Sequence, residues 1–390
     1  MNTNETEKID DIFDIANIII AGVTGAGKST LINAVFGNDF AATGKGRPVT
    51  QEIREYCSPN APVRIWDSIG FEIGNGNDGI SKTKASIEKI KQTIEQQASK
   101  GDPDRIHAIW YCINQGGSRY QPAEADFVKE LYLIGVPFII IITQCIDDDD
   151  EFVKEIEKLN HKNGIMDIPV IEVLAQDRKL KSGCIPAFGL DKLVDVTLEM
   201  LPDFIKRSFI AGQKIKVVLK RGECESIITK YEKLAEEGFW DKVPLINMGV
   251  ANSRFKKMVK EIFEIYNQII SEKDCDNIIV TVNGLLKKDQ FNWFFTPDFF
   301  NKKNKNKLER LMDEIREKGA DGLELTTRDF NESTRTARII IFYGYTLLMA
   351  VEDVWKMIRD EKIQNLEEVV IPQIKDRIQH YLSSKRNRNN

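Results

Sequence analysis

A glycine-rich segment near the N-terminus has the composition and spacing of a phosphate-binding loop. It matches the pattern G-x-x-x-x-G-K-[ST], whose fixed positions are occupied by Gly22, Gly27, Lys28 and Ser29. An apolar run precedes the loop and an amphipathic helical pattern follows it. Glycines let backbone N–H groups converge on phosphate oxygens, and the start of a helix adds a partial positive charge. The segment therefore predicts a site for the phosphates of a nucleotide.

Most residues of this loop and of the first helical turn are candidate ligand-binding residues. We expect Lys28 to place its charge on the β- and γ-phosphates and Ser29 to offer its hydroxyl to Mg²⁺. The expected phosphate-binding residues are Gly22, Thr24, Gly25, Ala26, Gly27, Lys28, Ser29 and Thr30.

Two further segments have the residues that a hydrolytic site would need. Asp67 and Gly70 follow a second apolar run at residues 63–66, where the carboxylate could hold Mg²⁺ and the Gly70 N–H could bind the γ-phosphate. Between the two segments, Pro48 imposes an extended approach to Thr50. We expect Thr50 to bind Mg²⁺ and the γ-phosphate and to order its loop only with the triphosphate, with Thr43 as the competing candidate. The predicted metal ligands are Ser29, Thr50 and Asp67, and the predicted catalytic residues are Lys28, Thr50 and Gly70.

The pattern of apolar residues indicates the elements that position these groups. Apolar runs at 17–21, 63–66, 107–113, 138–142 and 170–174 alternate with helical patterns at 29–36, 86–97, 124–133, 151–159 and 190–201. Such alternation predicts an α/β domain with a mainly parallel sheet. Beyond residue 202 the period is helical, at 206–237, 254–271, 305–318 and 339–380 with a break at Pro372. We expect a polar tail over 1–14, a nucleotide-binding domain over 15–201, an α-helical domain over 202–382 and a basic tail over 383–390.

These motifs together resemble a known family. The phosphate loop, the loop around Thr50 and residues 67–70 look like the first three motifs of the Era-like branch of translation-factor-type GTPases. The resemblance covers roughly residues 15–201 and extends to residues 110–114, 143–145, 173–175 and 188–193. These segments are similar to those of a bacterial subgroup whose G domain precedes a helical domain of unknown function. Septins, interferon-inducible GTPases and dynamin-like GTPases are more distant analogues. The resemblance implies a P-loop NTPase G domain with a mainly parallel central sheet, followed by an α-helical domain, with GTP or GDP and Mg²⁺ as ligands.

The segment expected to bind the base departs from the family pattern. The resemblance places Thr143, Gln144, Asp147, Leu174 and Ala175 at the base, but the family's [NT]-K-x-D motif has a lysine where this chain has Gln144. Asp147 also comes one residue late. Guanine specificity is therefore implied by resemblance only, and a P-loop ATPase stays an alternative.

A second departure concerns the rate of hydrolysis. Phe71 follows Gly70, where Ras-type proteins carry a glutamine that positions water. The resemblance therefore implies slow intrinsic turnover, with a catalytic element supplied by rearrangement, a cation or a partner. The expected function is a regulatory GTPase switch that couples nucleotide state to the helical domain. The alternative from another class is a nucleotide-binding interaction or membrane-surface protein with negligible turnover.

Composition limits the classes of protein and partner. The chain has 390 residues, with 42% hydrophobic and 29% charged residues and a net charge of −5, which excludes a disordered chain and a strongly basic nucleic-acid binder. Its six scattered cysteines form no C-x-x-C pair, and no apolar run reaches the ~20 residues of a membrane span. We therefore expect a cytoplasmic protein.

One aromatic and basic stretch, residues 287–307, raises the question of a partner. Its six aromatic residues are bordered by lysines on both sides, as in segments that lie at a membrane surface. Burial of these rings in the helical core is the simpler interpretation, and single-stranded nucleic acid is the least favoured. The stretch predicts a protein partner or membrane surface if its rings are exposed, and the family resemblance implies a nucleotide-dependent homodimer.

Overall fold

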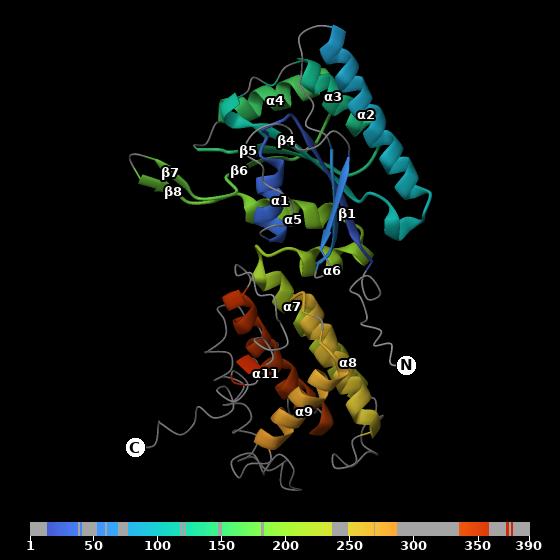
Figure 1. Ribbon diagram of the computed structural model, residues 1–390, viewed down its shortest axis with the longest axis vertical. Coiled ribbons are helices and arrows are strands. Elements are labelled where there is room, and N and C mark those ends of the chain that lie inside the picture. The colour runs from blue at the N-terminus through green and yellow to red at the C-terminus, as the bar shows by residue number, and fades with distance from the viewer. Residues whose placement is uncertain are drawn as a thin grey trace. The chain divides into compact units, whose positions relative to one another are not determined.

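The structure, a computed structural model, describes residues 14–37, 40, 53–58, 61–68, 77–117, 120, 122–146, 150–180, 183–235, 249–268, 270–286, 335–358, 372, 373 and 376. These residues fall into two compact units that divide between Val217 and Val218. The first unit is an α/β domain and the second is helical (Figure 1). The predicted class, an α/β domain with a mainly parallel sheet followed by an α-helical domain, is confirmed.

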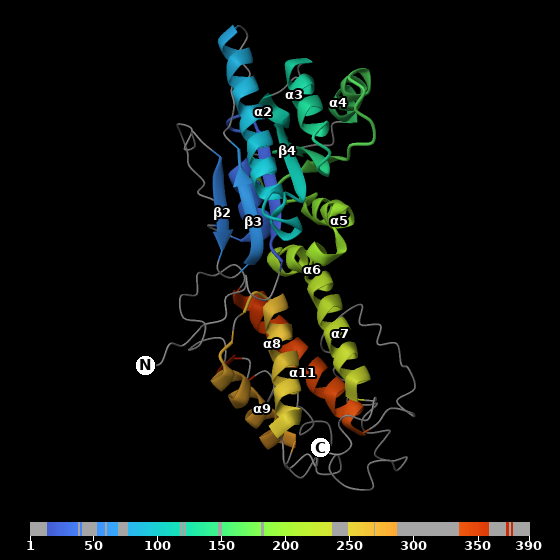
Figure 2. The ribbon, with the colours of Figure 1, turned by 90° about the vertical axis from the view of Figure 1, so that its right-hand side faces the viewer.

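The first unit is built on a six-stranded sheet in the order β2-β3-β1-β4-β5-β6. The parallel strands are β1 (Ala16–Gly22), β3 (Ala61–Asp67), β4 (Ala108–Asn114), β5 (Phe138–Thr143) and β6 (Val170–Val173). All five predicted apolar runs are therefore strands. Strand β2 (Arg54–Ser58), which the sequence pattern did not indicate, runs antiparallel to β3 at the edge of the sheet (Figure 2).

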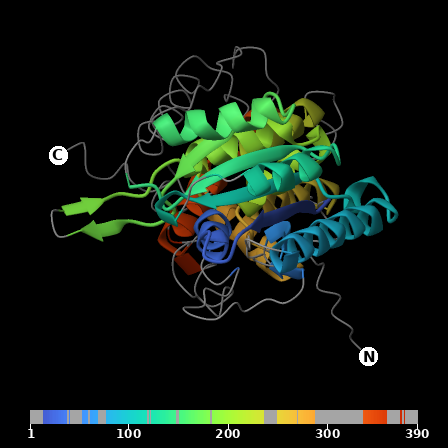
Figure 3. The same ribbon diagram turned by 90° about the horizontal axis from the view of Figure 1, so that it is seen from above.

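A small hairpin follows the last strand of the sheet. Strands β7 (Arg178–Leu180) and β8 (Gly183–Ile185) pair antiparallel and project from the domain (Figures 1 and 3). Past the hairpin, Phe188 returns to exchange two backbone hydrogen bonds with Leu174. The base of the hairpin is thereby fixed to the end of β6.

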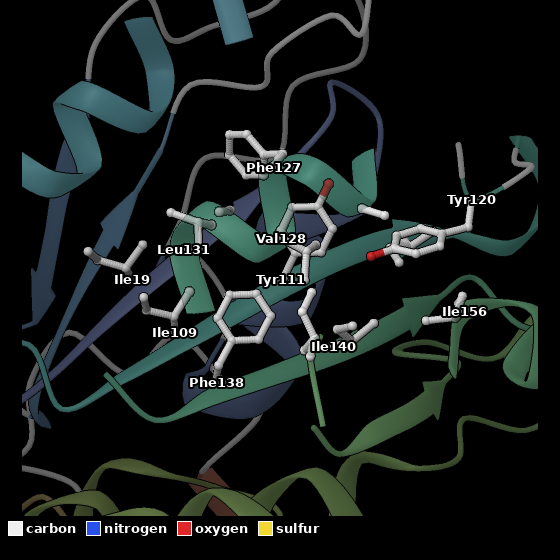
Figure 4. Packing of buried hydrophobic residues seen from close by; sticks show 14 of the residues in the cluster. Ile19, Ile109, Tyr111, Tyr120, Phe127, Val128, Leu131, Phe138, Ile140 and Ile156 are labelled. Carbon is white, nitrogen blue, oxygen red and sulfur yellow. The ribbon is translucent and has the colours of Figure 1, made fainter. Parts of the chain in front are cut away.

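Helices cover both faces of the sheet, as its apolar strands require. Helices α2 (Asn77–Ala98), α3 (Pro122–Tyr132) and α4 (Asp150–Lys162) pack on one face. Figure 4 shows the centre of this core, where Tyr111 of β4 lies among Phe127, Val128 and Leu131 of α3 and Phe138 of β5. Short 3₁₀ turns at Asp102–Asp104 and Gln115–Gly117 flank β4.

The opposite face is covered by α1 (Lys28–Phe36), α5 (Leu190–Met200) and α6 (Asp203–Gly212). Trp110 of β4 stacks on Phe36 of α1 and donates a hydrogen bond to Thr197 of α5. Phe209 of α6 packs edge-on against Phe36. Helix α6 therefore belongs to the sheet domain, although the sequence assigned it to the helical domain.

The strand register brings the predicted functional segments to one edge. Gly22 pairs with Cys112, Ile20 with Asp67, and Thr143 with both Asn114 and Val173. All of these residues lie at the carboxyl ends of parallel strands. The chain order also reverses around β1, so the phosphate loop leaves the sheet at a topological switch point, where ligands bind in open α/β sheets.

The second unit consists of α7 (Val217–Leu234), α8 (Gly249–Ile265), α9 (Glu272–Leu286) and α11 (Arg335–Ile358). The single helical segment predicted over 206–237 corresponds to two helices, α6 of the first unit and α7 of the second. The predicted segment 305–318 lies outside the described residues. A buried carboxylate, Glu352, links three of these helices: it accepts hydrogen bonds from Arg221 of α7, Tyr266 after α8 and Lys356 of α11. Among the described residues, no helix combines the length and the apolar character that crossing a bilayer requires.

Candidate functional site

The phosphate loop is held in shape by glycines with left-handed backbone angles. Gly22, Gly25 and Gly27 have φ values of 143°, 81° and 77°. A Cβ on Gly22 would lie 2.3 Å from the carbonyl oxygen of Cys112 on β4, so this position cannot hold a larger residue without moving the strand. The loop then enters α1 through a hydrogen bond from Leu31 N to Gly27 O at 2.9 Å. The first-turn N–H groups of α1 are thus available to an anion.

Lys28 lies across this loop. Its Nζ donates hydrogen bonds to the carbonyl oxygens of Gly22 at 2.9 Å and Val23 at 3.2 Å, and the residue is only 8% exposed. Burial lowers the pKa of Lys28, while the nearby Asp67 opposes that shift. The lysine is a buried charge partly compensated by one carboxylate, and both lie where phosphates are expected.

Asp67, at the end of β3, has an oxygen whose bonding capacity is unused. Its Oδ1 and the Oγ of Ser68 are buried without a hydrogen-bond partner among the described residues. Burial raises the pKa of Asp67 to about 6 despite the opposing charges of Lys28 and Arg54. A buried carboxylate oxygen left unpaired is costly, and a cation would offset that cost. Mg²⁺ prefers oxygen ligands and is commonly held by one or two carboxylates together with substrate phosphates, so the residues present fit this ion.

The end of β5 is tied to the phosphate loop from the other side. The Thr143 hydroxyl lies 2.6 Å from the carbonyl oxygen of Ala26, and Gln144 Nε2 donates to the carbonyl oxygen of Gly25 at 3.0 Å. Gln144 holds an unusual left-handed backbone, with φ 58°. The glutamine that stands in place of the family's lysine therefore supports the phosphate loop directly.

A cavity of about 320 Å³ opens beside these contacts. It brings together six of the predicted residues: Gly27, Thr30, Thr143, Gln144, Leu174 and Ala175. Three further residues complete its lining, Gln176, Asp177 and Arg178. The volume and the position next to the phosphate loop suit a nucleoside.

Three of the lining residues were not predicted to belong to the site: Gln176, Asp177 and Arg178. They directly follow the run at 170–174, so the rule that parallel strands deliver ligand-binding residues at their carboxyl ends could have found them. The structure fixes Asp177, because its Oδ1 accepts a hydrogen bond from Ala187 N at 2.8 Å. Asn114, another residue not predicted to be part of the site, donates to Gly25 O at 3.4 Å.

Several predicted residues lie outside the described part of the chain. They are Thr43, Thr50, Gly70, Phe71 and Asp147. The roles proposed for them stay predictions, as do the ligand contacts proposed for the described residues.

A phosphate loop between the first strand and first helix of a mainly parallel sheet, with a nucleoside-sized cavity beside it, defines a P-loop nucleotide-binding domain. Residues 17–176 match the family model described as 50S ribosome-binding GTPase. This match agrees with the resemblance of the sequence motifs to Era-like GTPases.

The chain is also similar to curated proteins. It is 30% identical over 172 residues to neuronal-specific septin-3 from Mus musculus, a match that covers 38% of this chain and 49% of the septin. It is 35% identical over 85 residues to the tRNA modification GTPase MnmE from Zymomonas mobilis, covering 21% and 19% of the two chains. The chain thus spans about half the length of the septin relative. A crystal structure of Era in complex with MgGDPNP and 16S ribosomal RNA nucleotides aligns with 49% of this chain and 58% of that chain at 18% identity, with a TM-score of 0.33.

Proposed function

We propose that this protein is a GTP-hydrolysing switch with slow intrinsic turnover. One observation carries the proposal: the segment that matches a GTPase family contains a closed phosphate loop with a buried lysine beside a buried carboxylate. The coupling of nucleotide state to the helical unit is part of the same proposal.

The phosphate loop would bind the nucleotide through its own backbone. The N–H groups from Gly25 to Thr30 would receive the phosphates, and Lys28 would exchange its contacts with the Gly22 and Val23 carbonyls for phosphate oxygens. Because the lysine is already buried, little reorganisation is needed when charge develops on the phosphoryl group.

Mg²⁺ would neutralise charge on the phosphates when bound. Asp67 and Ser29 are the described residues proposed to hold it, with Thr50 as a third ligand from the part of the chain that the structure does not describe. The unpaired Oδ1 of Asp67 is the feature that supports this assignment.

The switch itself would reside in the segments that contact the γ-phosphate. Thr50 and Gly70 are proposed to hold it, and its loss would release the loops around Thr50 and Phe71. With Phe71 in place of a glutamine, no side chain at that position can orient the attacking water through a hydrogen bond, which agrees with slow turnover.

Phosphate release under multiple turnover tests this function. Wild-type protein with GTP and Mg²⁺ should release phosphate slowly, and Lys28→Ala should abolish both release and tight nucleotide binding. Lys91→Ala is the matched control, because Lys91 pairs with Glu130 on the surface at 2.9 Å. A Lys28→Ala protein that hydrolysed GTP at the wild-type rate would refute the proposal.

Binding experiments with the same proteins distinguish this function from two alternatives, an ATPase and a membrane-surface protein. A tenfold preference for ATP over GTP in equilibrium titration would identify an ATPase. Nucleotide binding without turnover, combined with co-sedimentation on anionic vesicles, would identify a membrane-surface protein.

A membrane or protein contact through residues 287–307 and a nucleotide-dependent homodimer stay predictions. Sedimentation with GDP and with a non-hydrolysable GTP analogue tests the dimer.

A further inference from the structure

We propose that Asp177 is the carboxylate that reads the guanine base in this protein. The inference rests on the proposed function, since it assigns the base-recognising residue of that same site. It concerns a residue outside the shifted motif at 143–147, where sequence comparison would place base recognition.

The cavity supplies the first argument. Asp177 lines it together with Thr143, Gln144 and Ala175, and it is the single acidic side chain among the described residues of the lining. The phosphate loop contributes Gly27 and Thr30 to the same cavity. A nucleotide with its phosphates on the loop therefore places its base within the space that Asp177 faces.

The hydrogen bonds of Asp177 supply the second argument. Its Oδ1 accepts a hydrogen bond from Ala187 N at 2.8 Å, which fixes the orientation of the carboxylate. Ala187 is held in turn by its neighbour Phe188, which exchanges two backbone hydrogen bonds with Leu174 at 3.0 and 3.1 Å. The carboxylate is thus anchored to the sheet, and a preorganised acceptor loses less entropy on binding than a mobile one.

Two neighbouring polar side chains, those of Thr143 and Gln144, are already hydrogen-bonded to the phosphate loop. The Thr143 hydroxyl lies 2.6 Å from Ala26 O, and the Gln144 amide nitrogen donates to Gly25 O. Guanine presents two adjacent N–H donors, at N1 and at the 2-amino group, and a carboxylate is the side chain that accepts both. Asp177 supplies this acceptor.

Exchange of Asp177 for asparagine gives a test with a change of specificity as its readout. Asparagine keeps an oxygen that can accept from Ala187 N and replaces the other oxygen by an amide donor. Xanthine has a carbonyl oxygen where guanine has its 2-amino group, so the amide suits xanthine.

The affinities of GDP, IDP, XDP and ADP are measured by competition against a fluorescent GDP for wild type, Asp177→Asn, Asp147→Asn and Asp167→Asn. Asp167→Asn is the matched control: this exposed aspartate has φ 59°, which asparagine also adopts readily, and lies outside the cavity lining.

Wild type should prefer GDP over IDP and XDP. Asp177→Asn should weaken GDP binding about 10- to 100-fold and shift the preference toward XDP. Asp167→Asn should keep the wild-type order, and thermal denaturation should show that all variants are folded. The inference is overturned if Asp177→Asn keeps the wild-type ratio of GDP to XDP affinity, or if Asp147→Asn produces the change instead.

The experiment also separates failure of the inference from failure of the proposed function. If wild type binds none of the four nucleotides, or if Lys28→Ala binds GDP as tightly as wild type, the proposed function fails. If wild type binds GDP through Lys28 but Asp177→Asn is indistinguishable from it, the inference alone fails.

Discussion

Two buried lysines show how differently the same residue type can be used in one chain. Lys28 lies across a loop with a carboxylate nearby and could be assigned from sequence, because the phosphate-loop motif specifies its role. Lys220 has no motif. It is fully buried in the helical unit, donates to Ile265 O at 2.9 Å, and lies 5.3 Å from the ring centre of Trp355. A helical pattern cannot reveal such a residue, since a lysine at that spacing is normally solvated.

Lys220 should give the protein a distinctive dependence of stability on pH. Burial lowers its pKa to about 7 in the folded state, against 10.5 as the ordinary value. Between these pH values the unfolded chain binds one more proton, so the free energy of unfolding should rise with pH by about 1.4 kcal/mol per unit. Lys220→Met should remove that slope and stabilise the protein most at or below pH 7. Urea denaturation from about pH 7 to pH 9.5 measures it; equal slopes for the two proteins would contradict the prediction.

At the scale of elements, the predictable parts were those with strong periodicity. The apolar runs became β1, β3, β4, β5 and β6, because strands buried on both faces leave continuous apolar sequence. Strand β2 reads Arg-Glu-Tyr-Cys-Ser and lies at an edge, so its sequence carries no such run. Strands β7 and β8 are three residues each and largely exposed. The pairing of β2 with β3 and the pairing of β7 with β8 depend on the partner strand. The intrinsic strand propensity of these short segments does not reveal them.

Two helical glycines of the second unit provide a matched pair of substitutions. Gly222 in α7 is exposed and a Cβ there meets nothing within 4 Å, so Gly222→Ala should stabilise the protein by about 0.5–1 kcal/mol. Gly344 in α11 packs on Ile228, whose Cγ1 would lie 2.6 Å from an added Cβ. Gly344→Ala should destabilise by about 1–3 kcal/mol, less the gain in helix propensity. Urea denaturation followed by far-UV circular dichroism measures both, and the same sign for both would refute this packing.

At the scale of the molecule, the sequence placed the domain boundary too early. The apolar pattern changes to a helical period after Pro202, which predicted a boundary there. The two units divide between Val217 and Val218. Helix α6 has the period of the segments that follow, and periodicity does not tell which core a helix joins. Its buried Ile205 and Phe209 belong to the sheet domain, and Lys214 N beyond it donates to Val35 O at 2.8 Å.

Two truncations test this boundary. A chain ending at Val217 should be soluble, melt cooperatively and bind nucleotide. A chain ending at Leu201 should lose several kcal/mol of stability and aggregate, because the sheet face under Ile205 and Phe209 would be open to water; full burial of such a side chain contributes about 1.5–3 kcal/mol. Size-exclusion chromatography and thermal melting compare the two chains. Equal behaviour would restore the earlier boundary.

The distribution of thiols gives the molecule a native labelling scheme. All six cysteines lie in the described part of the chain; four are buried, whereas Cys57 on β2 and Cys184 on β8 are exposed. Cys184 lies on the hairpin whose first residue, Arg178, lines the cavity. A maleimide fluorophore at Cys184, with Cys57 replaced by serine, would therefore report optically on occupancy of the cavity in otherwise native protein.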